Sequence, residues 1–165
     1  MTRDDLNNVK EPLAALLLEL PQREIGGQLP AWDELLAIVN WVRERNIALH
    51  LDGARLWECR PFYRRSYAEI TAVFDTVYVS FYKILGGITG AMLLGSEDHI
   101  AEARIWQRRH GGNLVRMFPF VSSARLGLEA QLDRMGQYHA KAIELAEVLS
   151  AFPEIEVCRI RRTPI

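Results

Sequence analysis

Apolar and polar residues along the first part of the chain predict a strand followed by a loop. The apolar run at 14–18 is continuous, which is typical of a strand buried on both faces. Pro21 and the pair Gly26-Gly27 follow it, and residues of these types mark turns and loops. Because continuous apolar strands are common in parallel sheets, we expect this strand to belong to one.

A helix and a second strand are predicted next. From Pro30 onward, leucine, isoleucine and valine recur at helical spacing as far as Val42, and Asn46 can end the helix in a left-handed conformation. The apolar residues at 47–51 then predict a strand that ends at Asp52. The order strand, helix, strand predicts a βαβ unit with parallel strands and a right-handed crossover.

Two further strands complete the predicted sheet. They are expected at 73–80 and at 91–94, where apolar and β-branched residues gather. The ten residues between them, 81–90, are rich in glycine and too few for a parallel crossover, so the fourth strand is expected to run antiparallel. The predicted fold class is therefore α/β, with a mixed, mostly parallel sheet flanked by helices.

The rest of the chain is predicted to be mainly helical. Ser96 is expected to cap a helix with acidic residues in its first turn and basic residues in its last turn before Gly111. A long helical stretch with an apolar side is expected at 122–152, with Gly136 as a kink. A strand-like segment follows at 155–160. Because nothing is left to pair with that segment, we expect the chain to be a central fragment of a larger protein.

Composition narrows the class of protein. The chain has 165 residues, of which 49% are hydrophobic, and its net charge is -1, so no global field favours nucleic acid or an anionic membrane. No apolar run is long enough to span a membrane, and residues 1–10 are unlike a secretory signal. The only cysteines, Cys59 and Cys158, lack the spacing of a zinc site or a disulfide framework. We therefore expect a cytoplasmic protein that binds neither nucleic acid nor a membrane, and no metal site.

The first candidate for chemistry is the segment 50–55, which lies where the second strand ends. Ligands of open α/β sheets gather beyond the carboxyl ends of the strands. Strand alternation places His50 and Asp52 on one face, so Asp52 can point into such a crevice, with Arg55 close behind. The alternative is structural, since an isolated Asp-Gly-Ala-Arg is compatible with an aspartate that caps the next turn and a solvated arginine.

The second candidate is Lys83, which follows the third strand on a loop with Gly86 and Gly87. A lysine that is partly removed from water has a lowered pKa, and its neutral amine can attack an aldehyde to form a Schiff base. Ser80, three residues earlier, is a candidate to bind a phosphate near the same lysine. The alternatives are that Lys83 is a solvated surface group and that Ser80 caps the end of its strand.

Together these segments resemble the threonine aldolase / β-eliminating lyase family. The resemblance covers most of residues 12–130 in order. It rests on REIGGQLP at 23–30, HLDGARLW at 50–57, VYVSFYK at 77–83, GG at 86–87, GAMLLG at 90–95 and RRHGGN at 108–113.

The resemblance implies an enzyme that depends on pyridoxal 5'-phosphate and has part of the large domain of the aspartate aminotransferase-like fold. It implies that Lys83 is the Schiff-base lysine, that Asp52 pairs with the pyridine nitrogen and that Arg55 binds the carboxylate of an amino-acid substrate. Ser80 is a weaker candidate for the cofactor phosphate. It also implies assembly as a homo-oligomer. The implied domains are 1–152, part of the cofactor-binding domain, and 153–165, the start of a small domain.

The implied reaction is aldol cleavage of a β-hydroxy amino acid, threonine or allo-threonine, into glycine and acetaldehyde. β-Elimination would use the same lysine and aspartate, so the sequence leaves both reactions open. A third alternative is an inactive fragment that serves only as a folded or self-associating domain. Ile84 departs from the family pattern, which usually has glycine next to the lysine.

Overall fold

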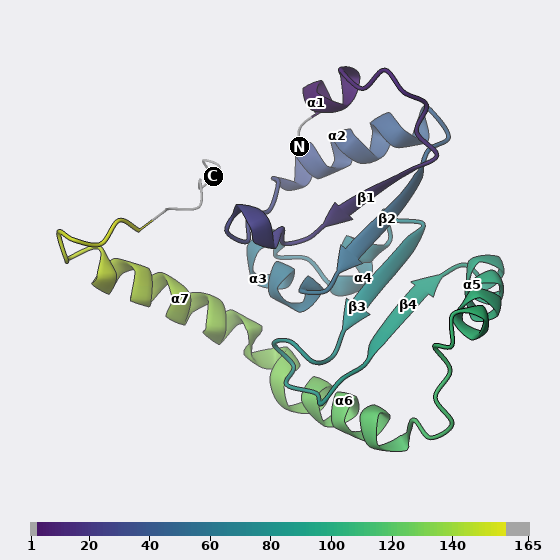
Figure 1. Cartoon of the computed structure of the whole chain (residues 1–165). Helices are drawn as coiled ribbons and strands as arrows, with labels where there is room; N and C mark the ends of the chain where they lie inside the picture. The colour runs from purple at the N-terminus through teal and green to yellow at the C-terminus, as the bar shows by residue number, and fades with distance from the viewer. Residues whose placement is uncertain (1–2, 158–165) are drawn as a thin grey trace.

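A computed structural model of the chain describes residues 3–157. Its centre is a four-stranded sheet in the order β1-β2-β3-β4, which Figure 1 shows between the helices. In chain order the elements are α1 (Arg3–Asn7), β1 (Ala15–Glu19), η1 (Arg23–Ile25), α2 (Trp32–Arg43), β2 (Ala48–Gly53), η2 (Leu56–Cys59), α3 (Arg60–Tyr63), α4 (Tyr67–Thr71), β3 (Thr76–Ser80), β4 (Ala91–Gly95), α5 (Glu97–Arg109), α6 (Phe118–Gln131), η3 (Leu132–Arg134) and α7 (Met135–Leu149).

The strand directions agree with the predicted mixed sheet. β1, β2 and β3 run parallel to one another, whereas β4 is antiparallel to β3. The helix α2 joins β1 to β2, and Asn46 follows it at a φ of 54°, as predicted. The short loop 81–90 explains the antiparallel β4, because it is too short to return the chain to the opposite end of the sheet.

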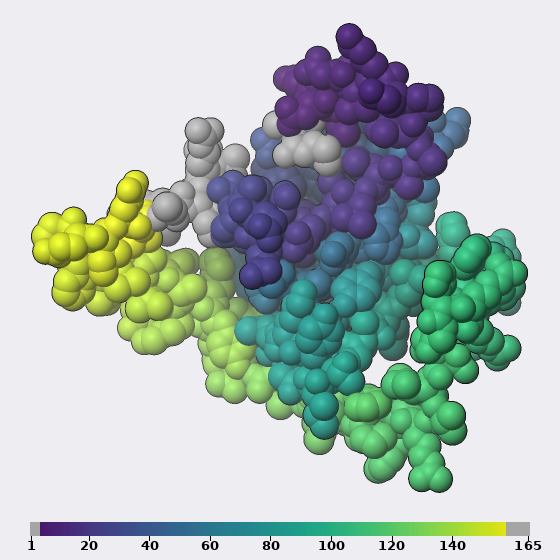
Figure 2. All heavy atoms as spheres, viewed as in Figure 1, coloured from purple at the N-terminus to yellow at the C-terminus, as the bar shows by residue number. Residues whose placement is uncertain are grey.

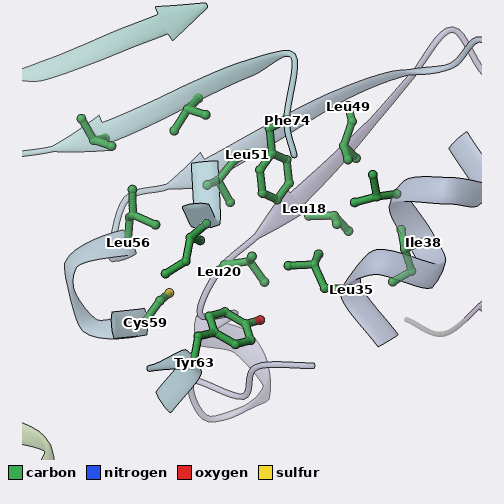
Figure 3. Close-up of a cluster of buried hydrophobic side chains, with 14 of the residues drawn as sticks. Leu18, Leu20, Leu35, Ile38, Leu49, Leu51, Leu56, Cys59, Tyr63 and Phe74 are labelled. Carbon is green, nitrogen blue, oxygen red and sulfur yellow. The ribbon is translucent and has the colours of Figure 1, made fainter. Parts of the chain in front are cut away.

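One face of the sheet is packed against helices to form the core. Leu49 and Leu51 of β2 are completely buried, and Figure 3 shows them with Leu18 among side chains of α2 and α3, such as Leu35 and Tyr63. Burial of a leucine side chain stabilises a fold by about 1.5–3 kcal/mol. The apolar positions that predicted the helix and strand thus also form the core.

The opposite face of the sheet is largely open. Leu17 of β1 is 57% exposed and Leu93 of β4 is 40% exposed. Figure 1 shows the strands with no helix drawn across them on the side toward the viewer. The prediction that the strand at 14–18 is buried on both faces is therefore wrong for this chain, since only its Leu18 face is covered.

The helices after the sheet differ in part from the prediction. Ser96 caps α5 by accepting a hydrogen bond from the His99 N–H, as predicted. The helical stretch expected at 122–152 begins earlier, at Phe118, and consists of two helices, α6 and α7, which meet at η3 just before the kink expected at Gly136. Figures 1 and 2 show α7 projecting from the body of the molecule. Its apolar residues Leu145 and Val148 are consequently 56% and 55% exposed, so they do not pack across the domain.

The end of the described chain is irregular. Residues 155–157 form no strand, and the remainder of the predicted strand at 155–160 lies outside the described residues. The division into 1–152 and 153–165 therefore stays a prediction. No helix within residues 3–157 is both long and apolar enough to cross a membrane.

Candidate active site

A hollow of about 540 Å³ lies on the open face of the sheet, and it contains both of the main predicted residues. It is open to solvent. The side chains that line it come from all four strands and from the segments that follow β2 and β3: Leu17, His50, Asp52, Ala54, Tyr78, Tyr82, Lys83 and Leu93. The fold thus brings the carboxylate of Asp52 and the amine of Lys83 to one place.

Asp52 stands on β2, which has a hydrogen-bonded strand on each side. It lies opposite Glu19 of β1 and Tyr78 of β3, and its backbone carbonyl accepts a hydrogen bond of 3.1 Å from the Leu20 N–H. The Ala54 N–H donates to Asp52 Oδ1 at 3.0 Å, which is the turn-capping contact that the structural alternative expects. Within residues 3–157, Oδ2 makes no hydrogen bond, so one carboxylate oxygen is left for a ligand.

Lys83 lies on a loop whose backbone is closed by its own hydrogen bonds. The Phe81 N–H donates to Gly90 O, the Gly87 N–H donates to Phe81 O, and the Gly86 N–H donates to Lys83 O, at 3.0, 2.8 and 2.9 Å. Gly86 has a φ of 70°, and a Cβ on Gly87 would lie only 2.6 Å from Phe81 O. Both positions therefore require glycine, one for its conformation and the other for a close approach of the backbone.

Ile84, next to the lysine, is partly buried against the hydrophobic core and is not among the residues that line the hollow. The departure from the family pattern at this position therefore does not place a side chain in the hollow.

Arg55 is near the hollow but is not part of its lining. Its Nη1 donates to Glu19 Oε1 at 3.4 Å, and the two side chains are 25% and 26% exposed. Arg55 is thus neither solvated nor free, contrary to the simple structural alternative. Sequence reasoning missed Glu19, although strand alternation from Leu17 places it on the same face and at the same end of the sheet as Asp52.

Ser80 does not face the hollow. Its side chain is completely buried, and its hydroxyl donates to Ala54 O at 2.7 Å. The segment after β2 folds over this end of β3, where the Trp57 indole N–H also donates to Ser80 O at 2.9 Å. The prediction that Ser80 binds a phosphate thus has no support in this geometry, which agrees instead with the alternative of a strand-end contact.

The polar side chains around Asp52 respond to partial burial. Burial lowers the pKa of His50 below its ordinary value, although the charge of Asp52 opposes the effect, and a hydrogen bond of 2.7 Å joins His50 Nδ1 to Thr76 Oγ1. Burial, the neighbouring Tyr82 hydroxyl and the charge of Asp52 raise the pKa of Tyr78 to about 12. Both shifts favour the uncharged forms of His50 and Tyr78 at pH 7.

Solved structures of similar proteins share this fold. The chain superposes with a TM-score of 0.91 on a putative L-allo-threonine aldolase from Listeria monocytogenes, with 50% identity over 93% of this chain and 43% of that one. It superposes with a TM-score of 0.90 on a putative aromatic amino acid beta-eliminating lyase/threonine aldolase from Exiguobacterium, with 52% identity and the same coverage.

Sequence comparison leads to the same family. The chain is 32% identical over 133 residues to the low specificity L-threonine aldolase of Escherichia coli K12, of which it covers 40%. It thus spans less than half the length of each of these three relatives. The family model of the beta-eliminating lyases matches residues 3–162. The chain therefore belongs to the beta-eliminating lyase family, and its mixed sheet is part of the fold of the threonine aldolases.

Proposed function

We propose that the chain carries the cofactor-binding part of a pyridoxal-phosphate-dependent lyase that cleaves threonine or allo-threonine into glycine and acetaldehyde. The observation that carries the proposal is the shared hollow of Lys83 and Asp52, an amine and a carboxylate on the same face of the sheet. The names of the Listeria and Escherichia coli relatives support an aldolase over other lyases.

The residues of the hollow suit the pyridine ring and the aldehyde group of this cofactor. An aldehyde needs an amine, which Lys83 supplies, and a pyridine nitrogen needs a carboxylate, which Asp52 supplies through Oδ2. The apolar side chains of Leu17 and Leu93 can flank an aromatic ring. The lining includes no arginine, the residue best suited to bind a phosphate, so the described residues account for the ring and the aldehyde and not for the phosphate.

When bound, the cofactor supplies an electron-accepting ring to the bond that breaks at the substrate Cα. Asp52 would hold the proton on the ring nitrogen, which maintains the ring as a cation. Lys83 would bind the cofactor aldehyde and give it up to the amino group of the substrate. Arg55 would bind the substrate carboxylate, since its planar fork of donors matches the two oxygens.

A labelling experiment tests the cofactor site directly. The purified chain is mixed with pyridoxal phosphate, reduced with borohydride and digested, and pyridoxyl groups are located by mass spectrometry. The chain has only three lysines, and Lys10 and Lys141 are exposed, so they are internal controls for surface labelling. We expect the label mainly on Lys83, and Lys83→Ala should lose it.

Equal labelling of the three lysines in a folded chain would contradict the proposal. The remaining function would then be that of a folded or self-associating domain without a cofactor.

β-Elimination is the second candidate, because the Exiguobacterium relative is described both as a beta-eliminating lyase and as a threonine aldolase. Product analysis separates the two reactions. Threonine should give glycine and acetaldehyde by aldol cleavage, whereas β-elimination from the same substrate would give a 2-oxo acid and ammonia.

We further propose that the protein is cytoplasmic and acts as a homo-oligomer.

A further inference from the structure

The guanidinium of Arg55 has one hydrogen-bond anchor within residues 3–157. That anchor is Glu19 Oε1, which accepts from Nη1, whereas Nη2 and Nε make no hydrogen bond to the described residues. A guanidinium carries five N–H donors in a plane and can bind a carboxylate through two of them at once. The contact with Glu19 therefore leaves an edge of the guanidinium available for one carboxylate ligand.

The sheet fixes the position of Glu19. It is the last residue of β1 and lies directly opposite Asp52, so two carboxylates stand side by side at this edge of the sheet. Glu19 Oε1 also accepts a hydrogen bond of 3.4 Å from the Arg23 N–H, which ties it to the start of η1. With about three quarters of each side chain removed from water, the pair with Arg55 is stronger than a fully exposed ion pair.

A second acidic residue competes for Arg55. Glu58 lies on η2, where burial raises its pKa and the charges of Arg55 and Lys83 oppose that rise. The Glu58 N–H donates to Arg55 O at 3.0 Å, but in the described part of the chain no hydrogen bond joins the two side chains, although their charges interact. Without Glu19, Glu58 would be the acidic group that attracts the guanidinium, and Arg55 would turn away from the end of β1.

We propose that Glu19 is a positioning residue, which holds Arg55 by one nitrogen so that the rest of the guanidinium binds the α-carboxylate of an amino-acid ligand. The inference rests on the proposed function, because it takes an amino acid as the ligand. It restricts the ligands to amino acids with a free α-carboxylate and disfavours their amides and esters. The negative charge of Glu19 also repels a carboxylate ligand, so loss of this charge alone would strengthen binding. Loss of positioning would weaken binding, and the direction of the change in affinity therefore separates the two roles.

The test compares two ligands that differ only at the carboxylate. The chain loaded with pyridoxal phosphate is titrated with glycine and with glycinamide, and the cofactor absorption reports binding. We expect Glu19→Ala, which leaves no acceptor for Arg55 Nη1, to lower the preference for glycine about tenfold, which is the effect of one lost directed contact. Glu58→Gln is the matched control, since it removes a charge near Arg55 but no hydrogen bond, and it should keep the preference.

An unchanged or increased preference for glycine in Glu19→Ala would overturn the proposal. So would equal losses in both variants, because they would point to net charge instead of position.

A second measurement needs no cofactor. The rate at which phenylglyoxal modifies Arg55, followed by mass spectrometry of the digested chain, should rise several-fold in Glu19→Ala and stay constant in Glu58→Gln. Equal rates in the wild type and Glu19→Ala would show that the contact does not hold Arg55 and would overturn the inference. Absence of label on Lys83 would instead contradict the proposed function, so the two failures are distinguishable.

Discussion

Asp75 is a single carboxylate that fixes β3 beside β2. Its Oδ2 accepts from the Leu49 N–H at 2.7 Å, and its Oδ1 accepts from Arg43 Nη1 at 2.5 Å. Burial alone would raise the pKa of Asp75, but these two contacts together hold it below its ordinary value. A carboxyl whose pKa is lowered by folding stabilises the folded state above its unfolded pKa of about 3.9, and this stabilisation is lost as the pH falls through the lower, folded pKa.

We therefore predict that Asp75→Asn lowers the free energy of unfolding at pH 7 by about 1 kcal/mol, a small value because the side chain is a quarter exposed. Urea unfolding at pH 7 and at pH 3 measures the difference. The gap between wild type and variant should shrink at pH 3, because below about pH 3.9 the unfolded carboxyl is protonated and folding no longer gains the full benefit of the charged contact. A gap of equal size at both pH values would rule out the charged contact. The exposed Asp133→Asn is a control that should show no gap.

At the same scale, the sequence predicts the residues whose position follows from a strand end. Asp52 lies at the carboxyl end of β2 and Lys83 follows that of β3, and the carboxyl ends of parallel strands share one edge of the sheet. The contacts of Arg55 and Ser80 depend instead on how the segment after β2 folds over that edge. Alternation along β3 places Ser80 on the open face with Tyr78, yet the chain at Ala54 covers it. No pattern within β3 itself predicts that the segment after β2 covers Ser80.

Among the elements, α6 supports the loop of Lys83. The backbone of Gly127 approaches so closely that a Cβ there would collide with Leu85 O, and Ser123 Oγ accepts a hydrogen bond of 2.9 Å from the Ile88 N–H. Leu85 and Ile88 both belong to the loop that carries Lys83. The contacts with α6 therefore fix the position of that loop relative to the sheet.

We predict that Gly127→Ala separates α6 from the loop, lowers the free energy of unfolding by about 1–3 kcal/mol and reduces pyridoxyl labelling of Lys83. Thermal unfolding and the labelling assay measure the two effects. Gly136→Ala is the matched control, because a Cβ there meets nothing within 4 Å and alanine favours a helix over glycine by about 1 kcal/mol. Equal stability of wild type and Gly127→Ala would contradict the close approach.

Sequence patterns predict some boundaries of the helices and not others. The capping residue Ser96 and the left-handed Asn46 were predictable because each acts within one turn of its helix. The kink expected at Gly136 lies close to the division between α6 and α7 at 132–134, but the pattern could not place it exactly, because residues on both sides continue the same helical pattern. Contacts with the rest of the fold decide where such a helix breaks.

At the scale of the molecule, much apolar surface is uncovered. Val115 is 99% exposed, Phe118 is 77% exposed and Ile88, beside α6, is 73% exposed. Monomeric proteins rarely expose contiguous apolar patches larger than a few hundred Å². We predict that the chain associates with itself as its concentration rises, with these residues in the contact.

Sedimentation velocity over a range of concentrations measures the association. The double variant Val115→Ser, Phe118→Ser should weaken it without loss of folding, since both side chains are exposed. Val148→Ser on α7, where the side chain is 55% exposed, is the control and should leave association unchanged. A wild-type chain that stays monomeric throughout would refute the prediction.

Asp52 and Lys83 stand on backbone segments that are held in place to different degrees. The strand of Asp52 has hydrogen-bonded neighbours on both sides, β1 and β3, so its carboxylate stands on backbone that cannot shift without distorting the sheet. Lys83 stands on a loop that is closed mainly by its own hydrogen bonds. When a cofactor binds, we therefore expect Lys83 and its loop to move and the Asp52 carboxylate to keep its position.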